Sequence, residues 1–319
     1  MRLNRLLVAM SAAGLMAMVG PAQASITFQF NPLGNGLGLG LINNSGILDQ
    51  APGNVNAVDG AGLGAVLPAG LPIHDLYQAN LGSVQAQDTT NLFSNGTNGG
   101  FGGPNRFFTF VASFAEKVVA SVVVAIPGGV QFINNFAVDG GGTFKMCKQS
   151  AIGNNLTGFG FGCDAMDTIL SGRIDGGDSS QTATFKPAIG FPVLDQAGVN
   201  NWPGTTTIPT IGTADLVATI KFVNAMYFPD LLIGRKIAIN SSLVTPYKQV
   251  DPSQSFSTGL VFNDTPTDIG AVNGIIGPNF IFQADANSSF DAPEPGALAL
   301  GGIALAGLAL LRSRRKQSV

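Results

Sequence analysis

The residue types that usually bind metals or catalyse reactions are scarce in this chain of 319 residues. It contains one histidine, His74, which excludes a zinc site built from several histidine ligands. His74 stands next to Asp75, but no Gly-x-Ser-x-Gly elbow accompanies the pair. An ordinary histidine in a loop or at a strand edge is therefore favoured over a catalytic dyad. The sequence therefore predicts no catalytic residue, no zinc site with several histidine ligands and no enzyme activity.

Glutamate and helix-forming patterns are also rare. Only Glu116 and Glu294 are glutamates among the 19 acidic residues, whereas Gly occurs 43 times. A composition rich in Asp, Asn and Gly favours turns and strands over helices. We expect an antiparallel β-sandwich of jelly-roll or related type over residues 25–290, with ten to twelve strands and long Gly/Asn-rich loops.

The strongest strand signals lie in the middle of the chain. Residues 106–114 and 118–126 are rich in aromatic and β-branched side chains, and Glu116-Lys117 between them predicts a polar hairpin turn. Residues 32–70 read as loop and residues 287–289 as a polar linker. Further strands are expected at residues 25–31, 130–138, 143–147, 181–185, 215–228, 231–240, 255–262 and 278–284.

The first 24 residues have the form of a secretory signal peptide. Arg2 and Arg5 precede a short apolar run, which is followed by an Ala-x-Ala cleavage motif. We expect signal peptidase to cut after Ala24, so that the mature protein is exported. The residues that define the cleavage site are Ala22, Ala24 and Ser25.

The last 29 residues combine three features in a fixed order. A Pro-Glu-Pro element is followed by an uncharged apolar stretch, residues 296–311, and then by a cluster of cations. Sixteen residues of helix span roughly 24 Å, slightly less than the roughly 30 Å hydrocarbon core of a bilayer. We expect a transmembrane helix here with the cations on the cytoplasmic side. The defining residues are Pro293, Glu294, Pro295, Arg312, Arg314 and Arg315.

This tail, residues 291–319, closely resembles the PEP-CTERM sorting signal of Gram-negative bacteria. The resemblance implies that an exosortase reads the tail at the inner membrane. The body would then be released or transferred to the cell surface, usually in species that make exopolysaccharide.

The exported body is acidic once both ends are set aside. Two of the 16 Lys and Arg lie in the leader and four in the tail, and two of the 19 Asp and Glu lie beyond residue 290. Ten cations and seventeen acids remain, a net charge of about −7. A surface of this sign does not attract nucleic acid.

Two cysteines and a group of aspartates complete the candidate sites. Cys147 and Cys163 are the only cysteines, and in an exported chain we expect them to form a disulfide; the absence of Cys-x-x-Cys speaks against a redox role. Four aspartates in a Gly-rich segment form a weak candidate for a Ca²⁺ site. We favour the alternative, that these aspartates lie in turns and are solvated. These acids are Asp164, Asp167, Asp175 and Asp178.

The overall layout is similar to the flocculation-associated PEP-CTERM family often called PepA. The likeness rests on residues 25–32, on residues 48–55, on the central cysteine pair and on the sorting tail. It implies a non-enzymatic protein that acts with exopolysaccharide to hold cells together in flocs. Two alternatives stay open: a secreted hydrolase of matrix polysaccharide with a carboxylate pair, and a calcium-dependent adhesin.

Overall fold

The computed structural model describes residues 26–58, 66–94, 106–156, 161–163, 166–256, 273 and 279–291. In these residues the protein is all-β, and its only helices are two short 3₁₀ turns. The chain divides into two compact units, and Ile26–Phe290 forms the larger one. The all-β prediction is confirmed.

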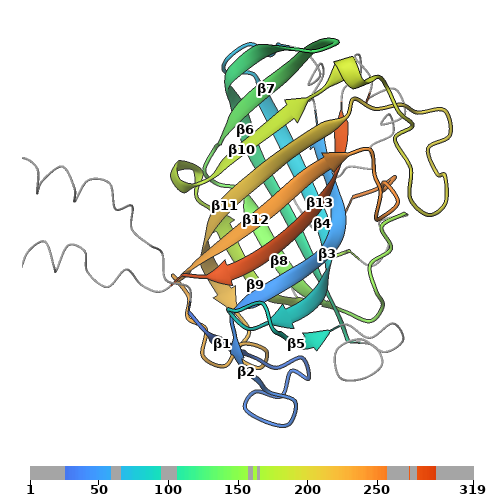
Figure 1. Ribbon diagram of the computed structural model, residues 1–319. Coiled ribbons are helices and arrows are strands. Elements are labelled where there is room, and N and C mark those ends of the chain that lie inside the picture. The colour runs from blue at the N-terminus through green and yellow to red at the C-terminus, as the bar shows by residue number, and fades with distance from the viewer. Residues whose placement is uncertain are drawn as a thin grey trace, which may run out of the picture. The chain divides into compact units, whose positions relative to one another are not determined.

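The described residues of this unit form thirteen strands and the two 3₁₀ turns (Figure 1). In chain order they are β1 Phe28–Phe30, β2 Ile42–Ser45, β3 Ile47–Val58, β4 Pro72–Gln85, β5 Asn91–Ser94, β6 Phe107–Ile126, β7 Gly129–Val138, β8 Thr143–Gln149, β9 Thr168–Ile174, η1 Gly176–Asp178, β10 Ser180–Phe185, η2 Pro187–Ile189, β11 Thr210–Val223, β12 Lys236–Thr245 and β13 Phe280–Phe290.

Eleven of the strands form one antiparallel sheet that closes on itself. β7 and β8 both pair with β6, β10 pairs with β7, and β9 pairs with β8. β11 pairs with both β9 and β10 and is followed by β12, β13, β3 and β4, and β4 then pairs with β6. Strands that follow one another in the chain are therefore mostly neighbours in the sheet. A jelly roll requires Greek-key crossings, so the jelly-roll part of the prediction is not confirmed.

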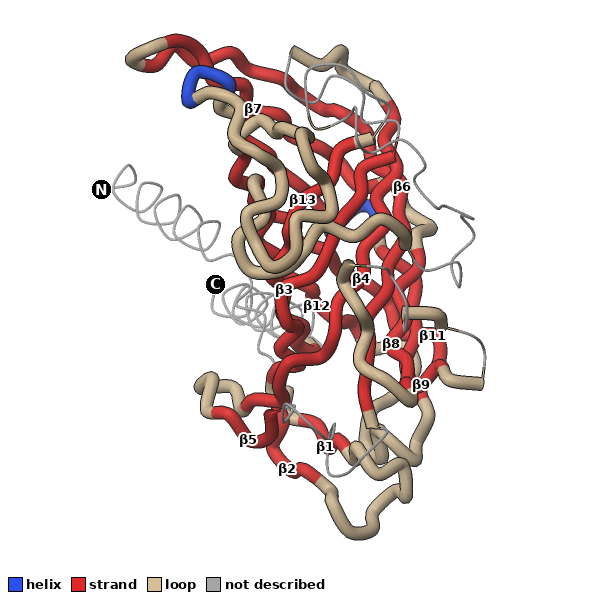
Figure 2. The backbone as a smooth tube through the Cα atoms, turned by 90° about the vertical axis from the view of Figure 1, so that its right-hand side faces the viewer, coloured by secondary structure: helices blue, strands red, loops and turns tan. Residues whose placement is uncertain are grey.

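The interior of the closed sheet is filled by alternate side chains. On β11, Leu216, Ala218 and Ile220 are buried while Thr213 and Asp215 are exposed, as the two-residue period of a strand requires. At the end where β1 and β2 lie (Figure 2), an aromatic cluster closes the core. Its ring centroids are 4.7 Å apart for Phe28–Phe290, 5.1 Å for Phe30–Phe228 and 5.3 Å for Phe30–Phe108.

The predicted turn at Glu116-Lys117 is wrong. β6 runs through both residues as a single strand of 20 residues. Glu116 is an inward position with 1% of its surface exposed, whereas Lys117 faces outward and pairs with Asp139 at 3.1 Å. The two adjacent charged residues therefore lie on opposite faces of one strand and do not form a turn.

Three other expectations about strand positions need correction. The segment 32–70, expected to be loop, contains β2 and β3, and β3 passes through Pro52-Gly53 with irregular register. The proposed linker 287–289 is part of β13, and the strand expected at 231–240 begins later, at Lys236. β4, which carries His74, had not been expected.

The two cysteines form a disulfide, as predicted. Together with Val111 and Phe161 they make a small second hydrophobic cluster, separate from the main core. Val111 belongs to β6 and faces away from the main core, so the disulfide fastens the segment after β8 against the outer side of the sheet.

The signal-cleavage residues Ala22, Ala24 and Ser25 and the sorting residues Pro293 to Arg315 lie outside the described residues, as does Asp164. In the part of the chain that the structure describes, no helix is long and apolar enough to cross a membrane.

Candidate functional site

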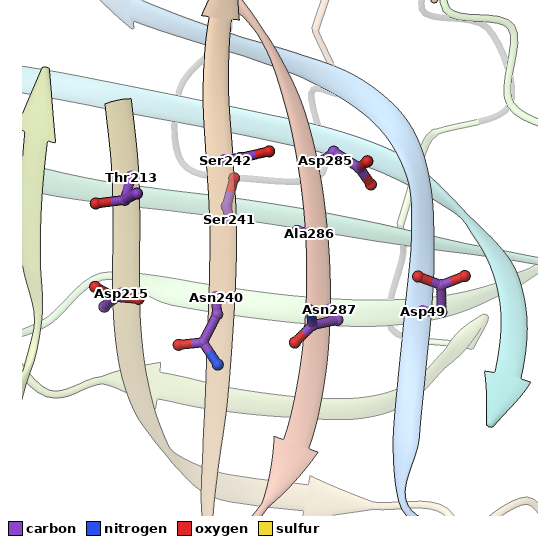
Figure 3. A pocket seen from close by; sticks show the side chains of 9 residues that line it. All are labelled: Asp49, Thr213, Asp215, Asn240, Ser241, Ser242, Asp285, Ala286 and Asn287. Carbon is purple, nitrogen blue, oxygen red and sulfur yellow. The ribbon is translucent and has the colours of Figure 1, made fainter. Parts of the chain in front are cut away.

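A polar groove lies on the outer face of β11, β12, β13 and β3 (Figure 3). Its volume is about 400 Å³. The side chains that line it are short, and they include three carboxylates and no Lys or Arg. The groove residues are Asp49, Thr213, Asp215, Asn240, Ser241, Ser242, Asp285, Ala286 and Asn287.

Strand register brings these residues into two rows. In the first row, partners on neighbouring strands run Asp215, Asn240, Asn287 and Asp49. With strands about 4.8 Å apart, this row of four is about 14 Å long. The second row is formed by Thr213, Ser242 and Asp285 in the same way. The groove is thus a regular array of hydrogen-bonding groups, in which each strand contributes one residue to a row.

The outer face is polar because the same strands must fill the core with their other face. On β13, Ala284 and Ala286 are almost fully buried, whereas the alternate residues Asp285 and Asn287 are exposed. Alternation of this kind places every second residue outside. Small inward residues and polar outward residues therefore shape the groove together.

One carboxylate of the groove is affected by the charge of another. Partial burial, and then the charge of Asp49, raises the pKa of Asp285. Asp49 Oδ2 accepts a hydrogen bond of 2.8 Å from Ser83 Oγ on β4. A positively charged group between Asp49 and Asp285 would relieve their repulsion, so the groove is suited to a neutral or cationic ligand.

A second pair of acids lies inside the sheet. Asp75 on β4 and Glu116 on β6 have 0% and 1% of their surfaces exposed. Burial raises the pKa of Asp75 to about 7, and burial together with the charge of Asp75 raises the pKa of Glu116 well above its usual range. Gln181 Nε2 donates to Glu116 Oε1 at 3.4 Å. Because the pair is sealed in the core, a polymer cannot reach it.

His74 and Asp75 point to opposite faces of β4. His74 is half-buried on the outer side, whereas Asp75 faces the interior. The structure therefore does not bring the two side chains together on one face of the strand.

The predicted Ca²⁺ candidates do not come together in the described residues. Asp175 Oδ2 accepts a 2.7 Å hydrogen bond from Thr219, and Asp178 pairs with Lys236 at 2.5 Å. Among the residues that the structure describes, no group of three or more His, Cys, Asp or Glu is placed to hold a metal ion. With Asp164 outside the described residues, Ca²⁺ binding by this loop stays a prediction.

Sequence reasoning did not find the groove. Its residues come from four strands spread over residues 49–287 and form no motif. Only the register of the closed sheet brings them together, and register depends on pairings between distant segments.

The comparisons with known proteins concern the C-terminal tail. The PEP-CTERM protein-sorting motif matches residues 291–316. No curated protein and no solved structure matches the chain. Fold and groove define an all-β protein with a polar outer face, and the motif implies that this protein is exported, sorted by an exosortase and associated with the surface of a Gram-negative cell.

Proposed function

We propose that the protein is a non-enzymatic component of the cell surface or extracellular matrix that promotes cell aggregation with exopolysaccharide. The observation that carries the proposal is the sorting motif at residues 291–316. Signal peptidase and exosortase act on the chain during export, and the processed body meets secreted polysaccharide. The similarity to flocculation-associated proteins in residues 25–32 and 48–55 supports this role, and residues 48–55 belong to β3, next to the groove.

The groove supplies a surface for such a polymer. Its hydroxyl, amide and carboxylate groups can exchange hydrogen bonds with sugar hydroxyls. The row from Asp215 to Asp49 offers one such group on each of four neighbouring strands. Because three carboxylates and no cations line the groove, it favours neutral or amino sugars over acidic polysaccharides.

The biological test is deletion of the gene under conditions in which polysaccharide is made. We expect aggregation to be lost and to return with the wild-type gene. A Glu294→Ala gene, which changes the sorting motif alone, should not restore it. Unchanged aggregation in the deletion strain would refute the proposal.

The binding prediction concerns the groove itself. The double variant Asp49→Asn/Asp285→Asn should bind a chitosan oligosaccharide about tenfold more weakly than wild type, because two charges that attract amino groups are removed. Alginate oligosaccharides should bind weakly to both proteins. Isothermal titration calorimetry measures this, and Asp139→Asn, outside the groove, serves as the matched control. Equal affinity of wild type and double variant for chitosan would exclude the groove as the contact.

One observation favours a second candidate, a polysaccharide hydrolase. Asp49 and Asp285 line the same groove, and the raised pKa of Asp285 is a property of general acids in glycosidases. This hypothesis predicts release of reducing ends from matrix polysaccharide and loss of that release in Asp285→Asn. The binding hypothesis predicts no release by either protein.

A further inference from the structure

In the part of the chain that the structure describes, one edge of β6 lacks a strand partner in its second half. β4 pairs with β6 only as far as Lys117, through Pro72. Leu71 and Gly70 then hydrogen-bond to the backbone of Val118 at 3.0 and 2.8 Å. Beyond that point Leu67 N donates to Ser121 Oγ at 3.1 Å. Among the described residues, no strand pairs with residues 120–126 on the side away from β7. We call this side of residues 120–126 the β6 edge.

The β6 edge carries exposed apolar side chains on both faces of the strand. Val122 pairs with Ile133 and Val123 with Phe132, so the two valines point to opposite faces. Val122 is 48% exposed and Val123 49%. The hairpin of β6 and β7 lies at the end of the unit opposite to β1 and β2 (Figures 1 and 2).

The usual protection of a strand edge is missing here. Natural edge strands carry charges, especially Lys, or Pro, or bulges that prevent pairing with another chain. No charged residue occurs between Lys117 and Asp139, and no proline occurs from Val118 to Ile126. The β6–β7 irregularity falls between Val118 and Ala120, before the β6 edge begins. An edge of this kind is ready to accept a further strand.

We propose that two copies of this protein pair through their β6 edges, antiparallel, so that the two sheets continue across a two-fold axis. An antiparallel pairing of identical strands is self-complementary, because each copy offers the same residues. The body carries a net charge of about −7, and the charge-free hairpin is a place where two such bodies can meet without opposing like charges. A second copy therefore fits the edge better than a charged partner.

The size of the contact sets its strength. Seven residues a side are far fewer than the roughly 20–30 residues a side of a stable interface. The dimer is therefore weak, with a dissociation constant in the micromolar to millimolar range. Weak contacts suffice between surfaces that display many copies, since multivalency raises the overall avidity by orders of magnitude. Paired edges would add a direct protein contact between cells to any contact through polysaccharide.

Sedimentation equilibrium of the mature protein isolated from its native host tests this proposal. We expect a monomer–dimer equilibrium for wild type and at least tenfold weaker association for Val122→Lys/Val123→Lys. The matched control is Ile233→Lys, at a 65% exposed apolar position between β11 and β12, which should associate as wild type does. A wild-type protein that stays monomeric at millimolar concentration, or a double variant that dimerises as wild type does, would overturn the proposal.

Single cysteines placed along the β6 edge give a second readout that does not depend on the stability of the lysine variants. In a two-fold antiparallel pair, one residue faces its own copy across the axis, and only there are the two Cα atoms within the roughly 4.4–6.8 Å that a disulfide needs. Cross-linking of single variants from Ala120→Cys to Ile126→Cys should therefore show one maximum. Uniform or absent cross-linking would refute the pairing. Normal aggregation of cells that carry Val122→Lys/Val123→Lys would count against a role for the dimer while leaving the surface function itself intact.

Discussion

At the scale of single residues, burial decides what the acids of this protein do. Asp75 and Glu116 lie in the core between β4, β6 and β10, and both keep their protons to higher pH than an exposed acid does. Asp49 and Asp285 lie on the outer face and remain accessible. The sequence shows Glu116 as one acid beside one lysine, and it contains no signal that the glutamate is sealed inside. That information comes from the alternation of β6 once its full length is known.

The buried pair makes stability depend on pH in a predictable direction. Unfolding exposes Asp75, whose pKa then falls from about 7 to its ordinary value of 3.8. Between about pH 4 and 7 the unfolded state binds fewer protons at this residue, so the contribution of Asp75 to stability is greatest below pH 4 and declines as pH rises through this range. The expected slope for one proton is about 1.4 kcal/mol per pH unit. Above about pH 7 the contribution of Asp75 no longer changes.

Asp75→Asn should remove the contribution of Asp75 to this decline. The variant is expected to match wild type near pH 4 and to be more stable at pH 8, because asparagine needs no proton to remain neutral. Urea unfolding at a series of pH values measures the difference, with the exposed Asp139→Asn as control. Parallel curves for wild type and Asp75→Asn would contradict the assignment.

At the scale of elements, composition and alternation predicted strands but not their order. The core segments of β6 and β7 were recognisable because aromatic and β-branched residues are dense there. β3 and β4 were missed because residues 48–58 and 72–85 mix Asn, Gln, Asp, Gly and Pro into both faces. Several of these polar residues are buried with partners: Tyr77 donates to Gln50 at 2.5 Å, and Gln50 donates to Ser288 at 2.7 Å. Such partners lie far apart in the chain, and a local pattern does not reveal them.

Close packing between neighbouring strands leads to a prediction for β9. A methyl group added at Gly172 would meet the ring of Phe144 on β8 and, at 2.6 Å, the carbonyl oxygen of Thr219 on β11. Gly172→Ala should therefore lower the free energy of unfolding by roughly 1–3 kcal/mol. Gly177→Ala in η1, where nothing lies within 4 Å, is the matched control and should change little. Chemical denaturation compares the two variants, and equal stability of both would show that β8, β9 and β11 are not packed as described.

At the scale of the whole molecule, a linear sorting motif is combined with surface features that depend on strand pairing. The PEP-CTERM motif implies export and sorting, and it could be recognised from its linear order of Pro-Glu-Pro, apolar stretch and cations. The closed sheet, its groove and the β6 edge depend on pairings between distant strands and became visible only in three dimensions. The sorting signal could thus be predicted from the sequence, whereas the groove and the β6 edge could not.

Mass spectrometry of the protein's two ends, combined with fractionation of its native host, tests the central claim most directly. The account predicts a chain that starts at Ser25, stops close to Pro293-Glu294-Pro295 and is recovered from the cell surface or the medium. Recovery of the uncut polypeptide, from Met1 to Val319, in the cytosolic fraction would contradict it.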